Sequence, residues 1–335
     1  MKASKTSATN EHSISEVESR FAYRVSTELE TIIARTGKTS PVGRQYLPDI
    51  RELDIIEAET SDPIGDHPHS PVKGIVHRYD HRALLKITNV CAVNCRFCFR
   101  KDMLGTADES LDSKDLQAAL DYLREHTEIN EVILTGGDPL ILSQRRLAAL
   151  FETLSAIDHI DIIRIHTRLP VAAPSKMPDL TALNLPEDKA LFIVLHINHA
   201  DEITDGMKNA CKALKTAGFT ILTQSVLLKG VNNTHEALHN LFTALIKMGV
   251  KPYYLHHPDL VSGTSHFRVS FEDGMALMKQ LQRSLSGIAI PQYVLDIPGG
   301  FGKVPVTPDY VRIIDDRYII TDPKGHEHIY PLPKT

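Results

Sequence analysis

About six short apolar runs, separated by amphipathic stretches, fill the middle of the chain and constrain its fold more than any other feature. In chain order they are ALLKIT, EVILT, DIIRIHT, LFIVLHI, FTILTQSVL and KPYYLHH. Each is close to continuously apolar, as expected of a strand covered on both faces of a sheet. Strands that alternate with helical stretches predict repeated β–α units and a parallel sheet.

The stretches between these runs carry apolar residues at helical spacing. Residues 114–125 place leucines and alanines on one stripe, and Asp112 or Ser113 can cap the first turn. Further helices are predicted to begin near Ser143, Thr204, Thr234 and Ser270. The third of these places Cys211 on its apolar face and should end at Gly218, so Cys211 is interpreted as a small core residue.

A chain of 335 residues, 42% of them hydrophobic, is long enough to bury one large core. The repeated units predict an α/β fold, a partial (β/α)6-type TIM barrel, with a doubly wound open sheet as the alternative. We expect residues 1–75 to form an N-terminal helical and irregular extension, 76–290 the barrel core and 291–335 a C-terminal segment. In either fold, catalytic groups belong at the carboxyl ends of the strands.

The overall charge favours a small-molecule partner. A net charge of −5, from 37 basic and 42 acidic residues, gives no field that would attract nucleic acid or an anionic membrane. The sequence has no run of about 18 apolar residues, and its first residues do not read as a secretory signal. We therefore expect a cytoplasmic protein, in which clustered cysteines bind metal more often than they form disulfides.

Three of the four cysteines lie within eight residues, in the stretch NVCAVNCRFCFRKD. Cys91, Cys95 and Cys98 directly follow the first predicted strand, where a barrel holds its active site. This spacing lets three thiolates converge on one centre and leaves one coordination position open. The open position would belong either to a catalytic zinc ion or to one iron of a [4Fe–4S] cluster.

Lys303 ends a glycine-rich loop in the stretch VLDIPGGFGKVPV. The loop does not fit a phosphate-binding P-loop, because Ile297 replaces its first glycine and Val304 its Ser or Thr. A lysine among glycines can instead form a Schiff base with pyridoxal phosphate, since missing side chains let the backbone and the cofactor approach closely. The alternative is a solvated lysine in an ordinary turn.

The cysteine loop resembles that of the radical S-adenosylmethionine (SAM) superfamily, in which the open iron binds the amino and carboxylate groups of the methionine part. Phe97 precedes the third cysteine, as is common there. Together with DIPGGFGK, the chain resembles the lysine 2,3-aminomutase family over about residues 75–312, including HRYDHRALLKIT, ILTGGDPL, IRIHTRLPV and PYYLHHPDL. The resemblance implies a radical SAM barrel with three cofactors: a [4Fe–4S] cluster, S-adenosyl-L-methionine and pyridoxal 5′-phosphate.

The family's activity moves the α-amino group of L-lysine to its β carbon. No side-chain base removes a hydrogen from an unactivated carbon at neutral pH. The resemblance implies that a 5′-deoxyadenosyl radical, formed by reductive cleavage of SAM, does so while the amino group migrates as an imine of pyridoxal phosphate. It also implies a reductant such as flavodoxin or ferredoxin. A homo-oligomer is left open, because the chain lacks the extra cysteines that form a zinc site between subunits in longer members.

The resemblance assigns roles to further residues. Arg100 matches the position that binds the substrate carboxylate, and Asp259 and Asp296 match the two carboxylates that bind the ε-ammonium group. Glutamate-using members replace these carboxylates, so the pair favours lysine. The remaining cofactor-binding positions are Arg78 and Arg82 near pyridoxal phosphate, Gly136, Gly137 and Asp138 near the amino group of SAM, and Arg168 and Gln224 in the pocket wall. His196 and His199 could face the cofactors or be structural.

Four alternatives stay open. Short family members include the enzyme that supplies β-lysine for the modification of elongation factor P, although that branch typically lacks the D-x-P-G-G-x-G-K loop. An aminomutase for another amino acid, such as glutamate, is the second. A radical SAM methyltransferase or maturase would share the cysteine loop without pyridoxal phosphate, and a zinc-stabilised interaction module would not be an enzyme.

Overall fold

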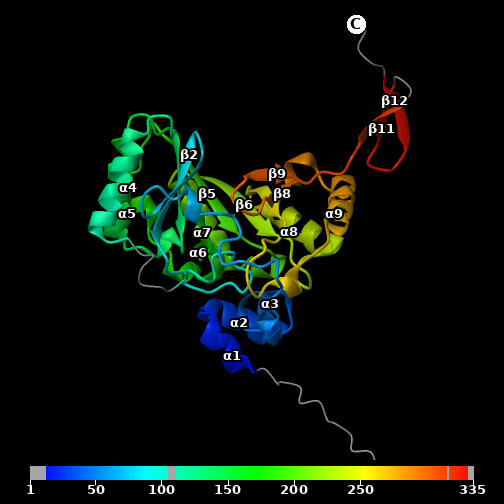
Figure 1. The fold of residues 1–335 in the computed structure, drawn as a ribbon, viewed down its shortest axis with the longest axis horizontal. Helices are drawn as coiled ribbons and strands as arrows, with labels where there is room; N and C mark the ends of the chain where they lie inside the picture. The colour runs from blue at the N-terminus through cyan, green and yellow to red at the C-terminus, as the bar shows by residue number, and fades with distance from the viewer. Residues whose placement is uncertain (1–12, 105–110, 315–316, 331–335) are drawn as a thin grey trace, which may run out of the picture.

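A nine-stranded sheet in unbroken chain order forms the centre of the molecule (Figure 1). The computed structural model describes residues 13–104, 111–314 and 317–330, so the first dozen residues lie outside it. The strands are β1 (Ile75–Tyr79), β2 (Arg82–Thr88), β3 (Glu131–Gly136), β4 (Ile162–Thr167), β5 (Ala190–His196), β6 (Thr220–Val226), β7 (Lys251–His256), β8 (Gln292–Asp296) and β9 (Lys303–Pro305).

The pairing of the strands decides between the two predicted folds. From β2 to β8 every neighbouring pair is parallel, and β1 and β9 are added antiparallel at the two edges. A doubly wound sheet would reverse its strand order at a switch point, and this sheet does not. The sheet is a curled, open half-barrel, which confirms the predicted partial barrel.

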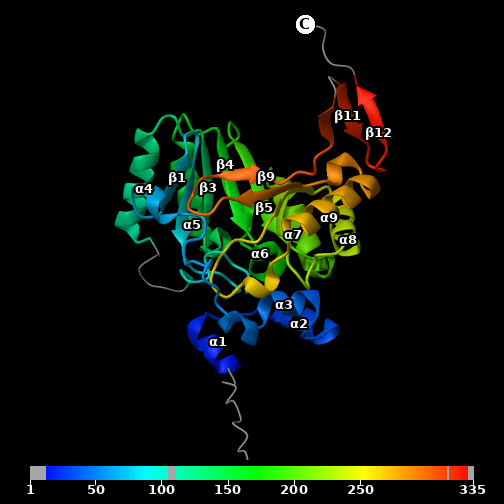
Figure 2. The same cartoon turned by 45° about the vertical axis from the view of Figure 1, so that its right-hand side comes forward.

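Helices follow the parallel strands and cover the outer face of the sheet (Figures 1 and 2). Five of them carry the predicted N-caps Asp112, Ser143, Thr204, Thr234 and Ser270. In each case the cap side chain accepts a hydrogen bond from a backbone N–H of the first turn. The helices are α4 (Ser113–Glu125), α5 (Gln144–Ser155), α6 (Leu169–Ala172), α7 (Asp205–Thr216), α8 (His235–Lys247) and α9 (Phe271–Ser284).

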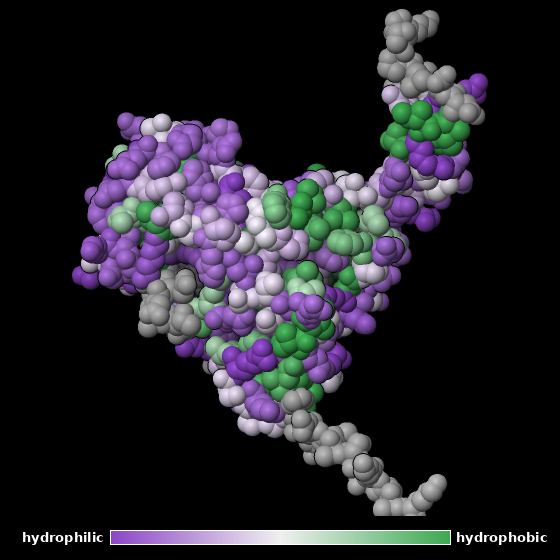
Figure 3. Space-filling model, viewed as in Figure 1, coloured by the Kyte–Doolittle hydropathy of each residue, from purple (hydrophilic) through white to green (hydrophobic). Residues whose placement is uncertain are grey.

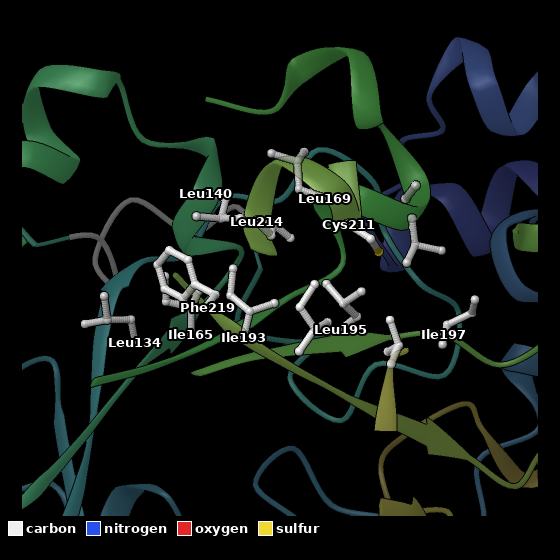
Figure 4. Close-up of a cluster of buried hydrophobic side chains, with 14 of the residues drawn as sticks. Leu134, Leu140, Ile165, Leu169, Ile193, Leu195, Ile197, Cys211, Leu214 and Phe219 are labelled. Atoms are coloured by element: carbon white, nitrogen blue, oxygen red, sulfur yellow. The ribbon is translucent and has the colours of Figure 1, made fainter. Parts of the chain in front are cut away.

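The core lies between the outer face of the sheet and these helices. Figure 4 shows Cys211 and Leu214 of α7 in one cluster of buried side chains with Ile193 and Leu195 of β5. Cys211 is only 2% exposed. The interpretation of Cys211 as a core residue is therefore confirmed.

The inner face of the sheet differs from the expectation that apolar residues cover each strand on both faces. Polar side chains on alternate residues of the strands, such as Glu131, Arg164, His166 and Gln224, line a cavity instead. The sheet curls around this cavity, so that only its convex face packs against helices. The apolar neighbours of these residues fill the outer core.

The N-terminal extension contains α1 (Ile14–Arg20), α2 (Thr27–Thr36) and α3 (Pro41–Tyr46), followed by the 3-10 helices η1 (Ile50–Leu53) and η2 (His67–His69). The extension is thus helical and irregular as predicted, with a break between Arg20 and Thr27. Tyr46 and Glu52 are fully buried. The extension therefore packs into the body of the molecule and contributes to its interior.

The C-terminal segment ends in a small antiparallel sheet that the sequence did not predict. Its strands are β10 (Val311–Ile314), β11 (Arg317–Thr321) and β12 (Glu327–Tyr330), which project beyond α9 (Figures 1 and 2). Val311 and Ile313 lie on one face of this sheet and Ile314 and Ile329 on the other, and all four are exposed. Figure 3 shows apolar surface over this sheet. Among the helices of the described residues, none is both long and apolar enough to cross a membrane.

Candidate active site

A cavity of about 380 Å³ opens on the concave face of the half-barrel. Its size falls within the range of small-molecule sites. Every residue to which the sequence assigned a site role lines it: Arg78, Arg82, Cys91, Cys95, Cys98, Arg100, Gly136, Gly137, Asp138, Arg168, Gln224, Asp259, Asp296 and Lys303. The structure therefore brings all the candidate residues together, while their individual roles stay predictions.

The N-terminal extension fixes the cysteine loop, which connects β2 to α4. Arg96, between the second and third cysteines, is 1% exposed and donates hydrogen bonds of 2.5 to 3.1 Å to the buried carboxylate of Glu52. Lys101 donates to the same carboxylate at 3.0 Å. Arg24 donates to the carbonyl oxygen of Cys91 at 3.0 Å. These contacts, of which those to Glu52 are buried, tie residues 91–101 to the N-terminal extension.

Burial keeps the three thiols protonated in the metal-free protein. It raises the pKa of Cys95 to about 12 and the pKa values of Cys91 and Cys98 above their ordinary value. A bound metal would displace these protons, because its charge deprotonates a coordinating thiol. In the described parts of the chain, no three His, Cys, Asp or Glu side chains form a group that could hold one metal ion. Three thiols on one cavity wall are nevertheless the donor type of an iron–sulfur cluster.

Lys303 lies opposite Asp296 because the glycine-rich loop is the turn of a β-hairpin. The strands β8 and β9 pair antiparallel, and Asp296 and Lys303 are direct partners in the register. The Lys303 ammonium group contacts the Asp296 carboxylate and lies 3.4 Å from Nδ1 of His256. Its backbone N–H donates to the hydroxyl oxygen of Tyr79 at 2.8 Å. This anchoring directs the lysine side chain into the cavity.

The two candidate substrate carboxylates differ in their protonation. Burial, reinforced by the negative charge of Asp296, raises the pKa of Asp259 to about 7. Burial alone would also raise the pKa of Asp296, but the hydrogen bond with His256 and the charge of Lys303 lower it well below its ordinary value. Near neutral pH, Asp296 is ionised and Asp259 is divided between its two forms.

The candidate anion-binding arginines line the same cavity, and Nη1 of Arg78 lies 3.9 Å from the Asp296 carboxylate. The Nε and Nη2 atoms of Arg100 each lie 2.8 Å from the Asp66 carboxylate. The Nη2 atom of Arg78 lies 3.4 Å from the same carboxylate. Arg82 stacks its guanidinium group 3.8 Å from the ring centroid of Tyr79. Three guanidinium groups at one cavity suit a carboxylate and a phosphate group as ligands.

The turn after β3 packs directly against the cysteine loop. A Cβ atom on Gly136 or Gly137 would overlap the backbone carbonyls of Thr88 and Val90, so only glycine fits at both positions. The Asp138 carboxylate accepts hydrogen bonds from the backbone of Leu140, Arg168 and Leu169 and from the Thr167 hydroxyl. These hydrogen bonds hold the residues that follow β3 against those at the end of β4.

Arg168 is tied to the N-terminal extension. It forms an ion pair of 2.6 Å with Glu202 and donates to the hydroxyl of Tyr46 at 2.5 Å. Its Nη1 atom is buried and has no hydrogen-bond partner among the described residues. An unpartnered buried donor at a cavity wall is consistent with a ligand that would accept from it.

Two histidines in the cavity wall were missed by the sequence analysis, His166 of β4 and His256 of β7. In each of these two residues and in His196, the Nε2 atom is buried at the inner face and has no hydrogen-bond partner within the described part of the chain. Burial lowers all three pKa values, so the rings are neutral. The sequence did contain a signal for such residues, because polar side chains alternate with apolar ones in runs such as IIRIHT and so lie on one face of the strand. His199 instead accepts a hydrogen bond from the backbone N–H of Asp201, at the start of the 3-10 helix η7 (Ala200–Glu202).

Comparisons with known proteins agree with the geometry of this site. The radical SAM superfamily model matches residues 85–242, and the model described as lysine-2,3-aminomutase matches residues 278–335. L-lysine 2,3-aminomutase of Escherichia coli (strain K12) is 37% identical over 85% of this chain and 83% of its own length. L-lysine 2,3-aminomutase of Fusobacterium nucleatum is 36% identical over 84% of this chain, which spans 66% of that protein's length, just under two thirds.

Glutamate 2,3-aminomutase of Clostridioides difficile (strain 630) is also similar, at 36% identity over 89% of this chain and 70% of its own length. The radical SAM superfamily binds a [4Fe–4S] cluster and SAM, and lysine 2,3-aminomutases use pyridoxal phosphate. The three-cysteine loop and the lysine in its glycine-rich turn fit these groups, since both line one cavity. The chain belongs to the lysine 2,3-aminomutase family of radical SAM isomerases.

Proposed function

We propose that this protein is an L-lysine 2,3-aminomutase, which moves the α-amino group of L-lysine to the β carbon and forms β-lysine. The observation that carries the proposal is that Lys303 and the three cysteines line the same cavity, although they are more than 200 residues apart in the sequence. A methyltransferase or a maturase would need the cysteines but not the lysine. A zinc-stabilised interaction module would need no enclosed cavity.

Two cofactors would supply the chemistry. When bound, the cluster provides the electron that cleaves SAM, and pyridoxal phosphate provides the π bond that the migrating amino group requires. Cys91, Cys95 and Cys98 would hold the cluster, and Lys303 would hold pyridoxal phosphate covalently. Arg78 and Arg82 are suited to its phosphate group by their charge. The cavity on the concave face of the sheet would shield these groups from bulk water.

The cavity carries the charges that free lysine requires. Arg100 would bind the substrate carboxylate, while Asp259 and Asp296 would bind the ε-ammonium group. The contact between the Lys303 ammonium group and Asp296 supports this role, because that carboxylate already accommodates an alkylammonium ion. Glutamate carries a second carboxylate in place of the ammonium group, so it would meet two negative side chains. We therefore favour lysine over glutamate.

The wider context of the enzyme is also part of the proposal. A radical SAM aminomutase needs a one-electron reductant, for which a flavodoxin or a ferredoxin is suited. We propose a cytoplasmic location, which agrees with thiols that must stay reduced to bind the cluster. The net charge of −5 supports neither nucleic acid nor an anionic membrane as a partner. The exposed apolar side chains on β10–β12 are compatible with a homo-oligomer.

An anaerobic assay with lysine, SAM, pyridoxal phosphate and dithionite tests the proposal. We expect β-lysine from the wild type, and for Asp296→Asn a decrease in kcat/KM of about thirtyfold or more, as for one partner removed from a buried charge pair. The matched control is Asp205→Asn, which removes a carboxylate from an exposed pair with Lys208. Turnover of glutamate but not lysine, or equal turnover of lysine by the wild type and Asp296→Asn, would contradict the assignment.

The raised pKa of Asp259 predicts a specific pH dependence. Only the ionised carboxylate attracts the substrate ammonium group, so kcat/KM for lysine should fall by up to about tenfold per pH unit below about pH 7. Asp296, Lys303, Arg100 and Arg78 are the charged groups that face Asp259. Kinetics between about pH 6 and pH 8.5 would measure the decline. In Asp259→Asn, kcat/KM should be lower than in the wild type and should no longer decline below about pH 7. If the variant kept the pH dependence of the wild type, Asp259 would not be the group responsible.

A further inference from the structure

Asp66, in the segment between η1 and β1, joins two arginines of the cavity wall. It is 1% exposed and lies behind Arg78 and Arg100 rather than among the described residues that line the cavity. Its Oδ2 atom lies 2.8 Å from both Nε and Nη2 of Arg100, and its Oδ1 atom lies 3.4 Å from Nη2 of Arg78. The carboxylate is ionised, because the charges of Arg100, Lys86 and Arg78 lower its pKa against the effect of burial.

These contacts fix the orientation of Arg100. With Nε and Nη2 held by Asp66, the remaining Nη1 lies 3.4 Å from the hydroxyl of Thr135, on the inner face of β3. The edge formed by Nη1 and Nη2 is thus the part of the guanidinium group that can still donate two hydrogen bonds to a second carboxylate. Asp66 therefore determines which edge of Arg100 is presented to a ligand.

Hydrogen bonds within its own segment also hold Asp66. The backbone N–H groups of Asp66 and His67 donate to the two carboxylate oxygens of Asp62 at 2.8 and 2.9 Å. The Ser70 hydroxyl donates to the carbonyl oxygen of Asp66 at 2.8 Å. These short local bonds mean that Asp66 is held by its own loop and does not depend on the arginines for its position.

The same segment also packs on the turn that precedes Lys303. The backbone N–H of Gly299 donates to the carbonyl oxygen of Pro63 at 3.2 Å. Gly65 has a φ of +67°, and a Cβ atom there would lie 2.7 Å from the backbone of Gly299. No side chain longer than hydrogen fits at this contact. The segment therefore touches the anion-binding arginines through Asp66 and the lysine turn through its backbone.

We propose that Asp66 is a positioning residue that orients Arg100 toward the substrate carboxylate and Arg78 toward the phosphate group of the cofactor. The inference rests on the proposed function for the identity of these two ligands, but not for the geometry of the arginines. Asp66 acts through the arginines and does not touch the substrate. Removing its charge should weaken the binding of both anions and leave the radical chemistry intact.

Asp66→Asn keeps the shape of the side chain and removes its charge. We expect KM for lysine to rise about tenfold, the dissociation constant for pyridoxal phosphate to rise several-fold, and kcat and iron content to stay within about twofold. Asp66→Glu should recover most of the lost affinity. The matched control Asp121→Asn removes a carboxylate from an exposed pair with Arg124 on α4 and should leave all these values unchanged.

A double-mutant cycle separates positioning from general loss of structure. If Asp66 acts through Arg100, the effect of Asp66→Asn on KM should shrink to less than about threefold in the Arg100→Lys background. A full tenfold effect in that background would overturn the proposal. So would a decrease in kcat with unchanged KM in Asp66→Asn.

A crystal structure of Asp66→Asn without ligands tests the geometry independently of any activity. The guanidinium groups of Arg100 and Arg78 should leave their wild-type positions, while the cysteine loop and the lysine turn stay in place. Guanidinium groups in unchanged positions would overturn the inference even if the enzyme is a lysine mutase. A wild-type protein without lysine turnover would instead overturn the proposed function, and the arginine positions would still decide the role of Asp66.

Discussion

Replacement of Lys303 by arginine should abolish β-lysine formation, with a loss on the order of a thousandfold or more, as for removal of a group that forms a covalent intermediate. Arginine keeps a positive charge opposite Asp296, which is the direct partner of residue 303 across the β8–β9 hairpin. It cannot form the covalent link to pyridoxal phosphate. The variant thus separates the covalent role of Lys303 from its contribution to charge balance in the cavity.

Borohydride reduction followed by peptide mass spectrometry measures this link directly. The wild type should carry the reduced cofactor on the peptide that contains Lys303, and the variant should carry none. Iron content and reductive cleavage of SAM should change little in the variant, since the cysteine loop is held by other residues, Glu52 and Arg24 among them. A label on a different lysine, or full turnover by Lys303→Arg, would show that Lys303 is not the attachment site.

The parallel sheet could be predicted because its signals are local. Runs such as EVILT and LFIVLHI became β3 and β5, and the N-caps Thr204 and Ser270 start the helices expected there. Curvature is not local, since it depends on how all the strands twist and pack together. For this reason the polar side chains between the apolar ones, such as His166 and His256, were not recognised as the wall of a cavity.

The candidate site was predicted from the chemistry of two short motifs and from a family resemblance. Cys91 and Lys303 come from opposite ends of the described chain and line one cavity, as that resemblance required. Asp66 could not be found in this way, because its partners Arg78 and Arg100 are 12 and 34 residues away and its loop has no regular pattern. The missing information is tertiary: which loop covers which strand end.

The cysteine loop allows a matched comparison within one chain. Cys98→Ala should reduce bound iron and sulfide and lower the reductive cleavage of SAM by more than about a hundredfold. This is a larger loss than is typical when a residue that only supports a metal ligand is replaced. Cys211→Ala removes a buried thiol from the core beside Leu214 and should retain both properties, at a small cost in thermal stability from the lost packing. Anaerobic metal analysis and release of 5′-deoxyadenosine measure the two outcomes. Loss of the cluster from both variants would trace the effect to folding, whereas iron retained in Cys98→Ala would exclude that thiol as a ligand and leave the three-cysteine centre without support.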